Sequence, residues 1–177
     1  MSSHPLSPTP ERTRDAVVLE LQPLLVDLLD LAMQAKQAHW TVTGATFFAV
    51  HSHLDKLNKM LRKAGDEIAE RCATLDRAPD GTVQRVAEST LLPPLERGFG
   101  PAQQLLDQLA ARLAAATART RERIDRLDSI DRLSADMVAR IATDMEKQCW
   151  MLQAYGADVP ERVVGRQEGR TTRAHPS

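Results

Sequence analysis

The feature that most constrains the fold is a series of four long helical patterns, joined by a short, a long and a short link. The first lies within "AVVLELQPLLVDLLDLAMQAKQAHW", where apolar residues recur at the spacing of one helix face. They are Leu21, Leu24, Leu25, Leu28, Leu29 and Ala32. Pro23 lies inside this pattern and predicts either a kink or a later start of the helix. Gly44 is expected to stop it, and a second helix is predicted from about Phe47 to about Leu75.

Two further helices are predicted in the second half of the chain. Pro101 is expected at the first position of the third helix, where its missing N–H has no partner to lose. A stretch rich in Ala, Leu and Arg continues this helix until "DSID" interrupts it. Ser134 is the expected N-cap of the fourth helix, which runs to about Tyr155 and stops at Gly156.

The link between the second and third helices, residues 76–100, is unusually long and contains several prolines and glycines. A short helix is predicted inside it at residues 83–89. The other two links are short, so the helices pair as hairpins. One long crossover between two hairpins is the connectivity of a ferritin-like four-helix bundle, and a plain up-and-down bundle does not need it. The predicted fold class is therefore all-α, with this bundle architecture.

Composition agrees with a single domain. The chain has 177 residues, of which 42% are apolar and 27% charged, as in ordinary globular domains. Residues 1–14 hold three prolines among serine and threonine and are predicted to be a disordered tail. The bundle is assigned to residues 15–156 and a mobile C-terminal tail to residues 157–177. The formal net charge of −1 gives no overall sign of nucleic-acid binding.

The sequence has no feature that is typical of a membrane or secreted protein. No apolar run approaches the roughly 20 residues of a membrane span. The N-terminus lacks the apolar segment of a secretory signal. Cys72 and Cys149 are the only cysteines, which fits a reducing compartment, although a single disulfide between them stays open as an alternative. We therefore expect a cytoplasmic protein without a membrane partner.

Histidines and acids of the first hairpin fall on shared helix faces. His51 and Asp55 are four residues apart in the second predicted helix. Asp66 and Glu70 repeat that spacing further along it. The eleven residues from Asp55 to Asp66 make about three turns, so all four side chains point in nearly one direction. His39 precedes the hairpin turn, which brings its imidazole level with that of His51.

One ion cannot bind both acid pairs of a single straight helix. Asp55 and Asp66 are eleven residues apart, or roughly 16 Å along the axis. A second chain placed antiparallel about a two-fold axis would set the distal acids of one chain opposite the histidines of the other. Imidazoles with carboxylates suit iron, and also zinc or manganese. The hypothesis is an intersubunit metal site, and the alternative is that these side chains are structural or solvated surface groups.

Three motifs make the chain resemble a known family. They are "KQAHW", then "F..VHSHLD" with its first histidine twelve residues after the histidine of the first motif, then "D..AER". The match extends over about Leu21 to Tyr155 and includes "PDGT" and "MEKQCWM". This pattern closely resembles the Dps family, the DNA-binding proteins from starved cells, a branch of the ferritin-like fold. Ordinary ferritins carry Glu-x-x-His pairs, which do not occur in this chain.

The resemblance implies a hollow homo-dodecamer with ferroxidase sites at its two-fold interfaces. The ligands carried over from the family are His39, His51 and Asp55 from one subunit and Asp66 and Glu70 from its mate. Such proteins oxidise Fe(II) with hydrogen peroxide, or oxygen, and store Fe(III) mineral, which protects DNA from oxidative damage. Trp40 matches the family's tryptophan beside the iron, where it is either a redox neighbour or a packed core aromatic.

The resemblance also implies acid-lined pores near the turn between the third and fourth helices. Asp128 and Asp131 are the candidates, since acids around a pore raise the local Fe(II) concentration. The alternative role for such acids is helix capping. Asp76 departs from the "LG" that the family commonly has after the second helix, so the conformation of that turn is not carried over.

Some members of the family bind DNA through basic tails, and the C-terminal tail of this chain has four arginines. They are Arg162, Arg166, Arg170 and Arg173. Asp158, two glutamates and the terminal carboxylate offset this charge, so we expect weak, salt-sensitive DNA binding at best, or a merely solvated tail. A nucleoid-associated DNA-binding protein with a secondary metal site is the alternative function. A zinc or manganese store without oxidation is a third.

Overall fold

The computed structural model describes residues 7–156, and within them it places five α-helices and two short strands. The elements are α1 (Glu11–Thr41), β1 (Val42–Thr43), α2 (Phe47–Thr74), α3 (Val83–Ser89), β2 (Gly100–Pro101), α4 (Ala102–Asp128) and α5 (Arg132–Gly156). The predicted all-α bundle with one long crossover is confirmed, including the short helix inside the crossover. No helix in this part of the chain is long and apolar enough to cross a membrane. The predicted C-terminal tail and residues 1–6 of the N-terminal one lie outside the described residues.

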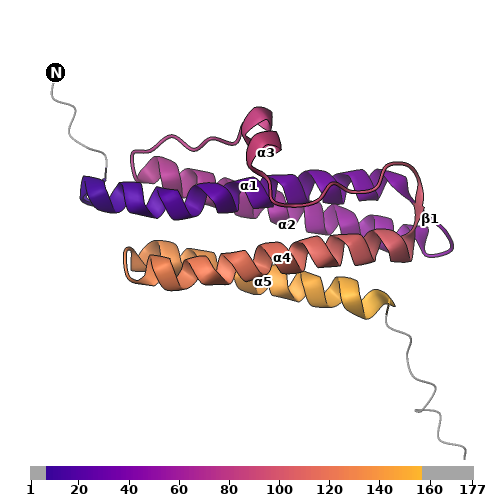
Figure 1. Ribbon diagram of the computed structural model, residues 1–177. Helices are drawn as coiled ribbons and strands as arrows, with labels where there is room; N and C mark the ends of the chain where they lie inside the picture. The colour runs from indigo at the N-terminus through magenta and orange to yellow at the C-terminus, as the bar shows by residue number, and fades with distance from the viewer. Residues whose placement is uncertain (1–6, 157–177) are drawn as a thin grey trace, which may run out of the picture.

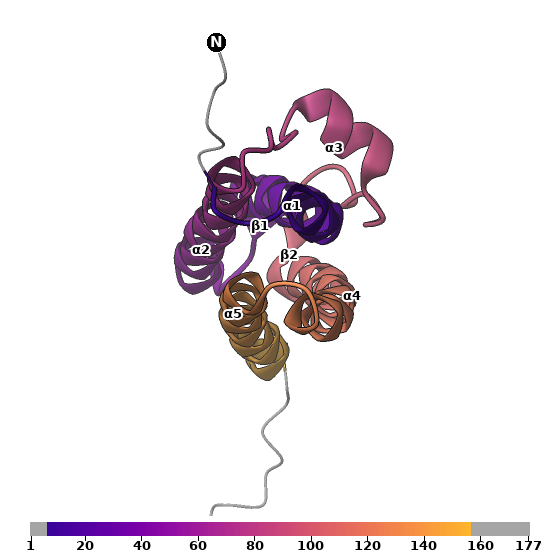
Figure 2. The same ribbon diagram turned by 90° about the vertical axis from the view of Figure 1, so that its left-hand side faces the viewer.

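The long helices form two hairpins that pack against each other (Figures 1 and 2). α1 pairs with α2 and α4 with α5, while α1 also contacts α4 and α2 contacts α5. α3 lies against the outer side of α1, away from the core between the four helices. The largest fully buried side chains include Leu21, Leu24, Leu28, Leu31, Leu54, Leu57, Leu61, Ile68, Leu106 and Leu109. Each such burial contributes roughly 1.5–3 kcal/mol, so the apolar helix faces hold the bundle together.

α1 runs through Pro23 without a break, and the alternative of a later helix start is therefore wrong. A proline in a helix interior costs about 3 kcal/mol, because it removes one hydrogen bond and crowds the preceding turn. Leu21 and Leu24 on either side of Pro23 are fully buried, whereas Pro23 itself is exposed. Burial of the two leucines is large enough to offset the cost of the proline.

The start of α1 corrects the predicted boundary between tail and bundle. The bundle is predicted to begin at residue 15, yet α1 begins at Glu11. The side chain of Arg14 is buried and donates a hydrogen bond to the carboxylate of Asp76 at 3.0 Å. This ion pair ties the first turn of α1 to the end of α2, so residues 11–14 belong to the bundle. Local composition could not predict this start of the helix, because the partner of Arg14 is 62 residues away in the chain.

Asp76 adopts the left-handed backbone conformation, with φ of +59°, just after α2. Glycine favours this region most, and aspartate tolerates it better than most other residues. The turn therefore has the kind of backbone that the family's glycine would allow. The carboxylate of Asp76 adds the ion pair with Arg14, which a glycine could not make.

A parallel ladder of two residues per strand, which was not predicted, joins β1, directly after α1, to β2, directly before α4. Val42 lies opposite Gly100, and Thr43 opposite Pro101. The Thr43 hydroxyl also donates to the Gly100 carbonyl oxygen at 3.1 Å. Pro101 consequently precedes α4, which begins at Ala102, and the prediction of proline at the first helical position is wrong by one residue.

The N-cap of α5 is also different from the predicted one. α5 begins at Arg132, before the predicted cap Ser134. The Ser134 N–H donates to Asp131 Oδ2 at 3.1 Å, and the Ser134 hydroxyl donates to the same carboxylate. Asp131 is therefore the capping residue, because it directly precedes the first helical residue and accepts from the Ser134 N–H, whereas Ser134 already lies inside the first turn.

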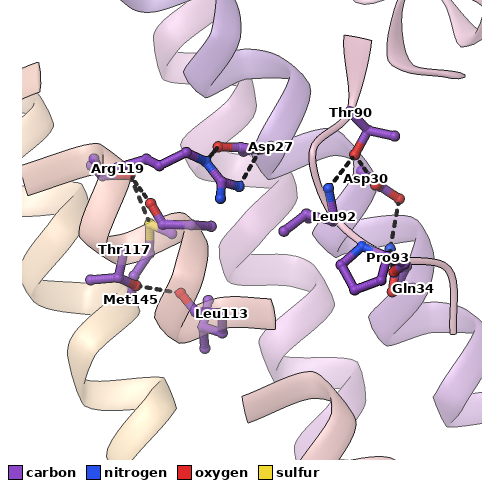
Figure 3. Close-up of polar contacts among 12 residues, drawn as sticks. Asp27, Asp30, Gln34, Thr90, Leu92, Pro93, Leu113, Thr117, Arg119 and Met145 are labelled. Atoms are coloured by element: carbon purple, nitrogen blue, oxygen red, sulfur yellow. Dashed lines mark hydrogen bonds and ion pairs between the residues drawn. The ribbon is translucent and has the colours of Figure 1, made fainter. Parts of the chain in front are cut away.

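The crossover is fixed to the bundle by hydrogen bonds from both hairpins, and Figure 3 shows those from α1. On the α1 side, Thr90 donates to Asp30, and Gln34 donates to the Pro93 carbonyl oxygen at 3.2 Å. On the α4 side, Arg112 donates to the same carbonyl at 3.0 Å. Donors from two different helices meet at one carbonyl oxygen of the crossover, so these contacts hold a long irregular segment in one position.

Candidate metal centre

His39 and His51 hold each other in place at the open end of the first hairpin. The Nδ1 of each ring lies 2.9 Å from the main-chain oxygen of the other residue. The two rings stack, with 3.6 Å between their centroids. A carbonyl oxygen only accepts, so each neutral ring carries its proton on Nδ1 and donates it. The Nε2 of each ring is therefore left with a lone pair, which is the form that binds a metal ion.

The turn between α1 and α2 produces this arrangement. His39 lies in the last turn of α1 and His51 in the second turn of α2, on either side of the turn. Gly44 within the turn has φ of +111°, a conformation that side chains rarely adopt, and its carbonyl accepts from the Phe47 N–H at 3.1 Å. The Phe47 ring then packs beside His51, with 4.9 Å between centroids. The predicted levelling of the two imidazoles is confirmed.

Asp55 follows one helical turn after His51, and its carboxylate lies between two lysines. Oδ1 is 2.9 Å from the Lys36 Nζ, and Oδ2 is 2.9 Å from the Lys59 Nζ. Hydrogen bonds from Lys59, and next from Lys36, hold the pKa of Asp55 well below its ordinary value. The carboxylate is therefore ionised throughout the neutral range, and a metal ion that binds either oxygen meets a lysine ammonium already hydrogen-bonded there.

Sequence reasoning missed both lysines as members of this site. Lys59 was visible as an i+4 neighbour of Asp55 on one helix. Lys36 was not, because it comes from α1 and its approach to Asp55 depends on how the two helices are aligned.

Asp66 and Glu70 lie further along α2 and are exposed. Within residues 7–156, no three His, Cys, Asp or Glu side chains come close enough together to hold a metal ion. The structure thus brings His39 and His51 together, with Asp55 one turn away, and leaves Asp66 and Glu70 separate from them. One chain therefore carries two separate groups of candidate ligands.

A groove of about 730 Å³ lies between α1, α2 and α3. Trp40 and Asp66 both line it, together with Met33, Arg62 and Val83. Trp40 is 62% exposed, so the alternative that it is a core aromatic is wrong for the isolated subunit. Trp40 and Asp66 therefore open onto one groove, on a surface that includes exposed apolar side chains.

The two pore candidates differ in their surroundings. Asp131 caps α5 and pairs with Arg71 at 2.6 Å, and its side chain is only 15% exposed. Burial raises the pKa of Asp131, but hydrogen bonds from Ser134 and Arg71 outweigh it, and the pKa is lowered overall. Asp128 is more exposed and pairs with Arg132 at 3.3 Å. The capping role of Asp131 is observed, whereas a pore role for either residue stays a prediction.

Comparisons with known proteins identify the family. The ferritin-like domain family matches residues 18–161. The DNA protection during starvation protein of Agrobacterium fabrum is 33% identical over 147 residues, covering 82% of this chain and 91% of that protein. The chain belongs to the Dps family. Among solved Dps structures, that from Mycobacterium smegmatis has a TM-score of 0.82 at 28% identity, covering 88% of this chain and 94% of that one. That from Microbacterium arborescens has a TM-score of 0.79 at 29% identity, covering 82% and 95%.

Proposed function

We propose that this Dps-family protein oxidises Fe(II) at sites shared between two subunits and stores the Fe(III) product in a hollow homo-dodecamer. The observation that carries the proposal is the pair of reciprocal hydrogen bonds between His39 and His51. They leave a lone pair on the Nε2 of each of two stacked rings, which are held by the main chain rather than by mobile side chains. With a nearby ionised Asp55, this set of nitrogen and oxygen donors fits iron.

Sharing between subunits would complete the site. Asp66 and Glu70 lie about three turns beyond Asp55 along α2, too far for one ion to reach. The groove that contains Asp66 also presents Trp40 and Met33, which are 62% and 47% exposed. Exposed apolar side chains beside a groove favour a partner surface, and a two-fold copy of this hairpin would cover it. The partner would then supply the two distal acids.

The proposed reaction treats iron as substrate and peroxide as oxidant. Two Fe(II) ions each lose one electron, and one hydrogen peroxide takes up both electrons and two protons to give two waters. The histidines would orient the iron, and the carboxylates would offset its rising positive charge. Trp40 is proposed as a redox neighbour. Consuming peroxide in two-electron steps would limit hydroxyl-radical formation, which agrees with the names of the DNA protection relatives.

Iron would reach the cavity through acid-lined openings near the α4–α5 turn. Asp128 is the better candidate, because its carboxylate is 55% exposed. Asp131 is retained as a second candidate, although its present contacts are with Arg71 and Ser134. Acids at a pore would concentrate Fe(II) by electrostatic attraction.

The direct test is anaerobic addition of Fe(II) followed by hydrogen peroxide, with ferric absorbance as the readout. Rapid oxidation is expected, with consumption of two Fe(II) ions for each peroxide. Light scattering of the same sample should give the size of a twelve-subunit particle. A protein that binds zinc or manganese but does not accelerate Fe(II) oxidation would instead support a metal store.

DNA binding is the second candidate function, and the names of the relatives favour testing it. The four arginines proposed as contacts, in residues 162–173, lie outside the described residues. We expect weak retardation of duplex DNA in a gel shift at low ionic strength, and its loss when salt is raised. The control is a chain that stops at Gly156. Equal retardation by both proteins would exclude the C-terminal tail as the binding element.

A further inference from the structure

The carboxylate of Asp55 has each of its oxygens bound by a different lysine. Lys36 approaches from α1 and Lys59 from the next turn of α2, both at 2.9 Å. Two positive charges therefore surround one negative charge at a residue that the proposed function makes an iron ligand. We infer that Lys59, by competing with the metal for Asp55 Oδ2, sets the affinity of the site for divalent cations. This inference rests on the proposed function.

The two lysines differ in how easily each can move away from the carboxylate of Asp55. The side chain of Lys59 is 74% exposed, whereas that of Lys36 is 31% exposed and lines the groove beside Trp40. An exposed ion pair between neighbouring turns of a helix is weak and exchanges readily with water. Lys59 can therefore swing into solvent while Asp55 stays in place. Lys36 is confined between the two helices and is the more permanent partner.

Binding an ammonium group and a metal ion to the same oxygen of Asp55 costs free energy. A lysine ammonium offers three donors and no acceptor, so it cannot itself bind the metal. A divalent ion near Asp55 would also be repelled by the charge of Lys59. In water, repulsion between a divalent ion and one ammonium about 6 Å away corresponds to about a tenfold change in affinity. Lys59 would therefore raise the Fe(II) concentration at which the site fills, without blocking it.

The test uses anaerobic titration of the assembled protein with Co(II), a probe that does not react as Fe(II) does. Lys59→Met removes the charge but keeps a long unbranched side chain and helix propensity. The matched control is Lys56→Met, which makes the same charge change at an exposed position of the same helix. Among the described residues, Lys56 forms no ion pair. We expect Lys59→Met to lower the Kd for Co(II) about tenfold and Lys56→Met to lower it only about threefold, because an ammonium about twice as far from the ion repels it half as strongly.

Two results would overturn the inference. Affinity that is unchanged or weaker in Lys59→Met, or an equal gain in Lys56→Met, would show that competition at Asp55 does not set the affinity. A parallel titration of His51→Ala separates this failure from failure of the proposed function. If His51→Ala binds Co(II) as the natural protein does, the metal is bound elsewhere, and both proposals are wrong.

Discussion

Replacing His51 by alanine is expected to slow peroxide-dependent Fe(II) oxidation at least about a hundredfold. Loss of a group that merely orients a metal ligand already costs 10- to 100-fold, as a rough guide, and here the ligand itself is removed. The main-chain oxygen of residue 51 remains in the variant and still accepts from the His39 Nδ1–H. His39 therefore keeps its proton on Nδ1, and the change isolates the missing Nε2 of His51.

The rate is measured by stopped-flow ferric absorbance at limiting Fe(II). His53→Ala is the matched control, because it removes an imidazole from the same helix two positions further on. His53 is not part of the stacked pair, and its ring lines a separate cavity with Trp150 and Tyr155. We expect its oxidation rate to stay within about twofold of the natural protein. Natural rates in His51→Ala would remove the proposed site from these residues.

Asp66→Ala is expected to be as slow as His51→Ala, yet the two variants should restore activity to each other when they are co-expressed. In a two-fold dimer of one variant with the other, one site has both defects and the other has neither. Random pairing makes about half of the dimers mixed, and each mixed dimer has one intact site of two, so about a quarter of the natural rate should return.

This complementation separates a shared site from one built by a single chain. If His51 and Asp66 acted within one chain, every site in the mixture would carry one defect, and the rate would stay at the level of the parent variants. The control is a mixture of the two variants after separate assembly, which should stay slow as long as subunits do not exchange. Particle size and thermal stability of each sample establish that the variants have assembled.

Much of the fold was predictable because the signals that specify it are local. The bounds of α3 agree with the predicted residues, and those of α2 differ by one residue, since Thr82 caps α3 and apolar periodicity defines α2. At two of the boundaries that differ from the prediction, a residue far away in the chain sets the boundary. The ion pair of Arg14 with Asp76 fixes the start of α1, and pairing with β1 places Pro101 in a strand. At α5, two residues three positions apart could cap the helix, and Asp131, which does so, also reaches Arg71.

The candidate site divides in the same way. The types and spacing of its residues were readable, and they indicated two ligand sets that one chain cannot combine. The proton positions on the two imidazoles were not readable, because they depend on main-chain oxygens across the hairpin. The contact between Lys36 and Asp55 depends on the same alignment of α1 against α2.

By itself, the sequence determined the helices, their connectivity and the candidate metal ligands, because periodicity, turn residues and residue spacing act over a few positions. Only the tertiary structure decided which form of each histidine is present, which cations hold Asp55 and which surface stays uncovered. Those properties arise from atoms that are far apart in the chain and meet only when the helices pack.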